Sequence, residues 1–309
     1  MKNRSIIWGI GICFMALMSG CQKDYYGKGL PFDMNTSNLP GYSNENIRVM
    51  CEDNYQRFMH ASYITVVDKF GNVHNVKISA NIKRNDWDFS NLVSEGTVKN
   101  YVFEDGTVSK VGIDISEHQG SINWEKVAKS VDFAYIRLGY RGYTGGNMAL
   151  DACYTANMEG AAEAGIPVGV YFYSQATSYD EGVQEANFVL SNLGEYALSY
   201  PIVLDREDPM QDDARTNDLS KEEHTQAALG FLDTITASGR KVMTYTNRNY
   251  YALYLDMDQI YQYPVWFAQY ADEPDWPHEF AIWQYTENGE IPGISGPVDL
   301  DLQMMNPNE

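Results

Sequence analysis

Basic residues are scarce in this sequence of 309 residues. Lys and Arg number 22 against 42 Asp and Glu, which gives a formal net charge of −20 at pH 7. A protein that binds nucleic acid needs a basic footprint, so the composition argues against that partner. The same charge gives no steering toward an anionic polymer, which stacking and hydrogen bonds would have to hold instead.

Cysteine and histidine are also few, with four Cys and five His. No pair of Cys has the spacing of a metal site and no H-x-x-x-H pattern occurs, so we expect no zinc or other metal. The acidic stretch 205–218 lacks the D-x-[DN]-x-[DN]-G pattern of a calcium loop. We therefore expect the protein to work without a cofactor.

The chain begins with a segment typical of export. Lys2 and Arg4 precede an apolar run, 6–18, that is too short to span a membrane comfortably as a helix. The sequence Leu17-Met-Ser-Gly-Cys21 then resembles a bacterial lipobox, which implies cleavage before Cys21 and lipidation of that residue. An ordinary signal peptide with an accidental Cys21 is the alternative. The lipobox predicts an exported lipoprotein anchored to a bacterial membrane.

Four regions follow from composition and pattern. Residues 1–20 are the expected signal peptide, and residues 21–45, rich in Gly, Asn, Ser and Pro, are an expected flexible tether. Residues 46–108 contain short β-rich runs separated by turn signals and predict a small β-rich module. Residues 109–309 form the main domain. Export permits a disulfide between Cys51 and Cys153, although two separate buried thiols are the alternative.

Residues 109–309 alternate strand and helix patterns at first and then lose the helices. The candidate strands are 111–115, 133–138, 167–173, 201–204, 241–246, 264–270, 280–285 and 298–302, and the candidate helices are 123–131, 151–164, 178–193 and 220–238. The last links are short and poor in helix formers, whereas parallel pairing usually needs a helical crossover. The pattern predicts an α/β fold, an irregular (β/α) TIM-like barrel with helices mainly in its first half. Such barrels carry catalytic residues at the C-terminal ends of their strands.

Two acids, Asp205 and Glu207, end the apolar run 201–204. Side chains alternate across a strand, so both carboxylates face the same side, with α-carbons roughly 6.5–7 Å apart. Two close carboxylates resist ionising together, which raises one pKa and keeps a general acid beside an anion. A solvated acidic strand end is the alternative for this pair alone.

Further acids and aromatic residues follow other strand ends. Asp114 ends the first strand, while Asp299 and Asp301 lie in the last, so Asp114 and Asp299 should meet if the barrel closes. Aromatic faces suit the apolar faces of sugar rings, although core packing explains some of them equally well. The aromatic candidates are Tyr140, Tyr171, Tyr173, Tyr245, Tyr270 and Trp283.

The motifs across residues 110–305 resemble the glycoside hydrolase family 25 lysozymes. The matching pieces, in the family's order, are Gly112-Ile-Asp-Ile-Ser-Glu-His-Gln-Gly120, Ile122-Asn-Trp124, Phe133-Ala-Tyr-Ile-Arg-Leu-Gly139, Ala164-Gly-Ile-Pro-Val-Gly-Val-Tyr-Phe-Tyr-Ser-Gln175, Asp205-Arg-Glu207, Val265-Trp-Phe-Ala-Gln-Tyr270, Ile282-Trp-Gln-Tyr285, Ile291-Pro-Gly-Ile294 and Val298-Asp299. The set is specific, although each piece alone would not be.

The resemblance implies an enzyme that cleaves the β-1,4 bond after N-acetylmuramic acid in peptidoglycan. We also expect the protein to be a monomer. Glu207 then looks like the general acid and Asp205 its charged partner, with Asp114 and Asp299 at the family's other acidic positions. The implied substrate-binding residues are Tyr173, Gln175, Tyr245, Trp283, Tyr270 and Arg137.

The sequence departs from the family pattern mildly. Asp301 stands where Asn is more usual, and Arg206 lies between the paired acids, where strand alternation should point it away from the site.

The resemblance favours a substrate-assisted, retaining reaction over direct attack by Asp205. Two other functions stay open at this point: an inactive surface protein that binds glycans, and a chitinase-like hydrolase.

Overall fold

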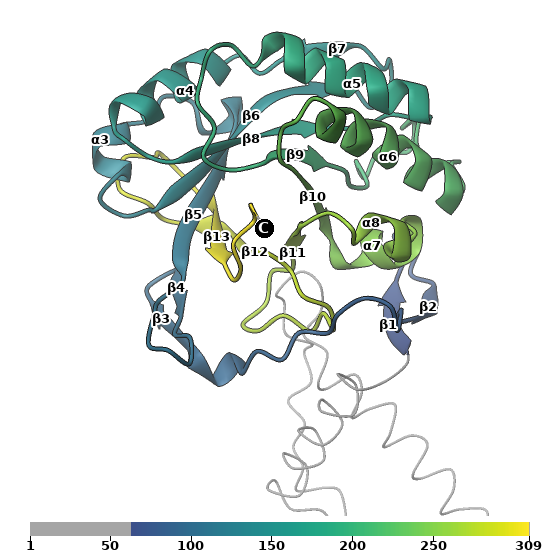
Figure 1. The fold of residues 1–309 in the computed structure, drawn as a ribbon, viewed down its shortest axis with the longest axis horizontal. Coiled ribbons are helices and arrows are strands. Elements are labelled where there is room, and N and C mark those ends of the chain that lie inside the picture. The colour runs from purple at the N-terminus through teal and green to yellow at the C-terminus, as the bar shows by residue number, and fades with distance from the viewer. Residues whose placement is uncertain (1–62, 309) are drawn as a thin grey trace, which may run out of the picture.

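The computed structural model describes residues 63–308, and its centre is a closed eight-stranded barrel (Figure 1). The strands follow the order β5-β13-β12-β11-β10-β9-β8-β6, and pairing of β5 with β6 closes the ring. Their bounds are β5 Lys110–Ile115, β6 Phe133–Arg141, β8 Val168–Tyr173, β9 Ile202–Asp205, β10 Val242–Asn247, β11 Val265–Ala268, β12 Ile282–Gly289 and β13 Val298–Gln303. The predicted irregular barrel is confirmed. A ninth strand, β7 (Met148–Leu150), which the sequence pattern did not predict, pairs with β6 outside the ring.

The last strand runs against its neighbours. β13 is antiparallel to both β12 and β5, whereas the other pairs within the ring are parallel. The link 290–297 is too short for a crossover, so the chain turns back as a hairpin. The link 269–281 joins the parallel strands β11 and β12 without a helix and packs the buried Trp276 into the core instead.

Helices cover the outside of the first half of the barrel (Figure 1). They are α3 Trp124–Val127, α4 Tyr154–Glu163, α5 Tyr179–Asn192, α6 Lys221–Ala237, α7 Arg248–Tyr254 and α8 Met257–Ile260, with 3₁₀ turns η2 Phe89–Asn91 and η3 Glu117–Gln119. Ser178 and Ser220 cap α5 and α6 as their spacing predicts. The expected helices 123–131 and 151–164 are shorter than predicted, and α7 and α8 were not predicted.

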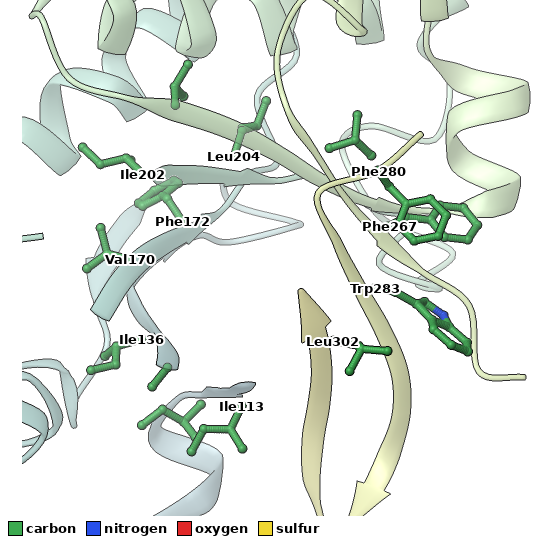
Figure 2. Close-up of a cluster of buried hydrophobic side chains, with 14 of the residues drawn as sticks. Ile113, Ile136, Val170, Phe172, Ile202, Leu204, Phe267, Phe280, Trp283 and Leu302 are labelled. Carbon is green, nitrogen blue, oxygen red and sulfur yellow. The ribbon is translucent and has the colours of Figure 1, made fainter. Parts of the chain in front are cut away.

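Strand alternation divides the buried side chains into two cores. Figure 2 shows the outer one, in which Ile136, Val170 and Leu204 lie on the sheet's outward face. The inner core fills the barrel below its C-terminal rim, where the ring of Trp266 stacks on Tyr135 with centroids 4.6 Å apart. Polar side chains occupy the rim of the barrel above this inner core.

The described part of the small β-rich module consists of two hairpins. The first pairs β1 (Tyr63–Val67) with β2 (Val73–Lys77), and the second pairs β3 (Leu92–Glu95) with β4 (Val98–Tyr101). β3 was not predicted. The buried side chains of both hairpins join the outer core of the barrel, so the hairpins and the barrel share one core.

The signal segment, the tether, Cys21, Cys51 and residues 46–62 lie outside the described residues. Cys153 is a free cysteine just before α4. Among residues 63–308, no helix has both the length and the apolar character needed to cross a membrane.

Candidate active site

The barrel opens at the C-terminal ends of its parallel strands into a cleft of about 1740 Å³. Four predicted acids line this cleft: Asp114 from β5, Asp205 from β9, Glu207 just after β9, and Asp299 from β13. Asp299 pairs in register with Asp114, as closure of the barrel requires. The fold therefore brings together acids that are far apart in the sequence.

Glu207 has a strongly perturbed carboxyl group. Burial, followed by the charges of Asp299 and Asp208, raises its pKa to about 7. Burial and Glu287 raise the pKa of Asp299 to about 7 as well. A glutamic acid with a pKa near neutrality suits a group that must donate a proton at neutral pH.

Asp205 has a different environment from Glu207. Burial and the charges of Glu207 and Asp299 raise its pKa well above the usual value, and the guanidinium of Arg137 opposes part of this rise. Arg137 is itself held by Asp151, with Nε to Oδ2 at 2.7 Å, and by Glu117. The Asp205 Oδ1 atom is buried without a hydrogen-bond partner among the described residues. An unpaired buried oxygen in a cleft is available to interact with a bound molecule.

Gln284 organises the opposite wall of the cleft. Its Nε2 donates to Asp114 Oδ2 at 2.7 Å, and its Oε1 accepts from the hydroxyls of Tyr245 at 2.9 Å and Tyr270 at 3.0 Å. Sequence reasoning missed this residue. Strand alternation offered the signal, because Gln284 and its neighbour Trp283 must face opposite sides of β12.

Four of the six predicted substrate-binding residues line the cleft: Tyr173, Tyr245, Tyr270 and Arg137. The other two, Trp283 and Gln175, are not among the residues that line it. Trp283 faces the outer core, fully buried, and donates from Nε1 to the Gln269 carbonyl (Figure 2). Gln175 is buried behind the cleft, where it accepts from Thr216 and donates to the Glu207 carbonyl at 3.3 Å.

Gln175 therefore supports the backbone that carries Glu207. Tyr140 and Tyr171, noted above as aromatic candidates, also line the cleft.

Arg206 points away from the cleft, as strand alternation predicted. Its guanidinium donates to Ser174 Oγ at 3.2 Å and the Ala176 carbonyl at 2.9 Å, and lies 3.1 Å from His224 Nδ1. Burial and the Arg206 charge lower the pKa of His224 to about 3, so this imidazole is neutral and accepts the bond. Arg206 thus anchors β9 from behind.

Asp301 lies in the barrel interior below the cleft. Its Oδ1 accepts from Trp266 Nε1 at 2.8 Å, while Oδ2 is buried without a partner among residues 63–308. Burial and the charge of Asp299 raise its pKa well above the usual value. The raised pKa favours the protonated form of Asp301, which has the shape and charge of an asparagine.

Replacing Asp301 with Asn should stabilise the protein at alkaline pH. The folded state holds a proton that the unfolded chain releases above about pH 3.9. The wild type therefore loses stability as the pH rises from about 3.9 toward the raised pKa of Asp301 in the folded state. We expect Asp301→Asn to raise the melting temperature by about 2–4 °C at pH 8 and to leave it nearly unchanged at pH 4. Calorimetry at both pH values measures this, and a lower melting temperature at pH 8 would contradict it.

The chain matches one family model and is similar to known lysozymes. The family model for glycosyl hydrolases family 25 matches residues 113–294. The autolytic lysozyme of Clostridium acetobutylicum is 29% identical over 192 residues, which cover 62% of this chain and 54% of that protein. Lysozyme M1 of Streptomyces globisporus is 30% identical over 199 residues, which cover 61% of this chain and 65% of that protein.

A solved structure has the same fold. The bacterial lysozyme from Streptomyces coelicolor superimposes with a TM-score of 0.52 at 28% identity, over 63% of this chain and 92% of that one. The chain spans about half the length of the Clostridium relative.

Proposed function

Because the chain belongs to glycosyl hydrolases family 25, we propose that it is a lysozyme that cleaves the β-1,4 bond between N-acetylmuramic acid and N-acetylglucosamine in peptidoglycan. The observation that carries the proposal is the pair of a buried Asp205 and a half-buried Glu207 at the end of β9, both lining one cleft. Hydrolysis of this bond needs a proton for the leaving oxygen and stabilisation of positive charge at the anomeric carbon. A protonated and an ionised carboxyl group can supply both.

Glu207 is the general acid in this proposal. The two carboxyls are close enough to titrate as a pair that holds one proton over the working pH range. Arg137 favours the anion on Asp205, whereas the charges acting on Glu207, those of Asp299 and Asp208, favour its protonated form. We assign the shared proton to Glu207, because the Arg137 guanidinium acts on Asp205 and stabilises its anion.

The reaction then proceeds with help from the substrate. Glu207 gives its proton to the leaving oxygen as the C1–O bond breaks, and the oxygen of the substrate's own 2-acetamido group bonds to C1 from the opposite face. Asp205 stabilises the positive charge of the resulting ring. Water, deprotonated by the Glu207 carboxylate, then attacks C1 and reopens the ring, so the configuration at C1 is retained. The unpaired Asp205 Oδ1 suits this electrostatic role.

Aromatic side chains, and not positive charges, hold the substrate in this proposal. Tyr173, Tyr245 and Tyr270 line the cleft and offer ring faces and hydroxyls to sugars. We further propose that the protein acts as a monomer, exported and tethered to a bacterial membrane through lipid on Cys21.

Mass spectrometry of digested peptidoglycan tests the proposed function. The purified protein is incubated with peptidoglycan and, separately, with chitin, and the products are reduced with borohydride before analysis. We expect fragments that end in reduced N-acetylmuramic acid, and no chitin products. Reduced N-acetylglucosamine ends or chitin cleavage would indicate a different glycosidase, and no products from several wall types would indicate a glycan-binding protein.

A further inference from the structure

The first hairpin reaches the segment that carries the proposed general acid. Lys69, in the turn between β1 and β2, places its Nζ 3.1 Å from Asp208 Oδ2 and 2.8 Å from Asn217 Oδ1. Asp208 directly follows Glu207 in the chain. The contact therefore links the N-terminal hairpin, which carries none of the predicted catalytic residues, to the catalytic strand end.

We propose that Lys69 is a positioning residue for Glu207: by pairing with Asp208 and Asn217, it fixes the loop that carries the acid and balances the charge beside it. The inference rests on the proposed function, in which Glu207 is the acid, and extends the active site to a segment outside the region matched by the family model.

The hairpin is built to hold Lys69 in place. The Asp68 carboxylate accepts from the backbone N–H groups of Phe70 at 2.9 Å and Asn72 at 2.8 Å and lies 2.9 Å from His74 Nε2, which together fix the turn. Behind it, β1 buries alternate side chains in the outer core. The fixed turn keeps the Lys69 backbone where its side chain reaches Asp208 and Asn217.

The barrel also holds this hairpin from α7. Asn249 Nδ2 donates to the Val67 carbonyl at 2.8 Å, and Arg248 donates to the Thr65 carbonyl at 3.1 Å (Figure 1 shows β1 beside α7). The hairpin is thus part of the cleft wall, and Val67, Asp68 and Lys69 line the same cleft as Glu207.

Asn217 completes the link on the other side. Its Nδ2 donates to the carbonyls of Gln211 at 2.8 Å and Asp212 at 3.0 Å, while its Oδ1 accepts from Lys69. Asp208 in turn accepts from the Met210 N–H at 2.8 Å. Lys69 therefore closes the loop 208–217 onto the hairpin, and loss of Lys69 would free the loop's first residue next to the acid.

Besides Lys69, the cleft holds the cation Arg137, which acts on Asp205, the neighbour of Glu207. The groups that act on Glu207 or border it are Asp205 on β9, Asp208 after it, Asp299 on β13, and the hydroxyls of Tyr173, Tyr245 and Tyr270. Asp208 disfavours the Glu207 anion, and Lys69 offsets Asp208. Removing either partner should therefore change the pKa of Glu207, in opposite directions.

The test compares Lys69→Met with Asp208→Asn. Loss of the lysine leaves Asp208 unbalanced, so the pKa of Glu207 should rise by about half a unit, and loss of Asp208 should lower it by a similar amount. Because the acid acts in its protonated form, the alkaline limb of kcat/KM should move to higher pH in the first variant and to lower pH in the second. Lys77→Met removes an exposed lysine from the same hairpin and is the matched control, expected to leave the limb in place.

A second readout does not depend on turnover. The Glu207 carboxyl resonance is titrated by ¹³C NMR in each variant, with the assignment made from its absence in Glu207→Gln. Opposite shifts relative to Lys77→Met support the role of Lys69, whereas unshifted titrations, or shifts of the same sign, overturn it. Opposite NMR shifts in a protein that hydrolyses no peptidoglycan would support the charge arrangement and reject the proposed function.

Discussion

Replacing Glu207 with Gln is expected to reduce kcat on peptidoglycan by about 10²- to 10⁴-fold, with little change in KM. Gln has nearly the same shape but cannot donate the proton that the leaving oxygen needs. Burial, Asp299 and Asp208 keep that proton on the wild-type residue up to a pH of about 7. Release of reducing ends, followed over time with purified peptidoglycan, measures the loss.

The loss should come from chemistry and not from unfolding. The raised pKa of Glu207 means that folding retains a proton that the unfolded chain releases above about pH 4.3, so the wild type is less stable at pH 8 than a neutral variant would be. Glu207→Gln should therefore melt no lower than the wild type at pH 8. Glu195→Gln, an exposed glutamate change, is the control. Wild-type activity in Glu207→Gln would reject Glu207 as the acid.

Replacing Asp205 with Asn should reduce kcat by about 10²- to 10³-fold. The variant loses the negative charge that stabilises the positively charged ring. In the wild type, Asp205 Oδ1 makes no hydrogen bond to any described residue. It also loses the charge that favours protonation of its neighbour, so the alkaline limb of kcat/KM should move to lower pH. A pH profile of the variant against the wild type measures both effects.

The same residue separates two chemical routes. If the substrate's acetamido group attacks C1, intact-protein mass spectrometry during turnover should show no glycosyl adduct on the wild-type protein. An adduct on Asp205 would indicate direct attack and contradict the substrate-assisted route. Activity of Asp205→Asn within a few-fold of the wild type would exclude both roles for this residue.

Much of the barrel could be predicted from the sequence because its signals are local. The apolar runs of β9 and β10, the capping serines Ser178 and Ser220, and the acids at strand ends depend on neighbours within a few residues. In a closed barrel the first and last strands are neighbours, so closure pairs Asp114 with Asp299.

Other features could not be predicted with the same reasoning. Alternation states that Trp283 and Gln284 face opposite sides, but which side is the cleft depends on how β12 joins the closed ring. The family resemblance placed Trp283 in the cleft, and the structure places Gln284 there. The resemblance also placed Gln175 in the cleft, whereas in the structure its side chain is buried and accepts a hydrogen bond from Thr216.

The sequence by itself determined the strands and helices of the barrel and the acids at the strand ends. The reason is that hydrophobic periodicity and helix capping depend on neighbours within a few residues. The tertiary structure alone decided the inward face of β12 and the link from Lys69 to Asp208, two residues that are 139 positions apart in the sequence. No local pattern encodes such a contact. It exists because the hairpin buries its apolar face against the same core as the barrel, which brings its turn to the edge of the cleft.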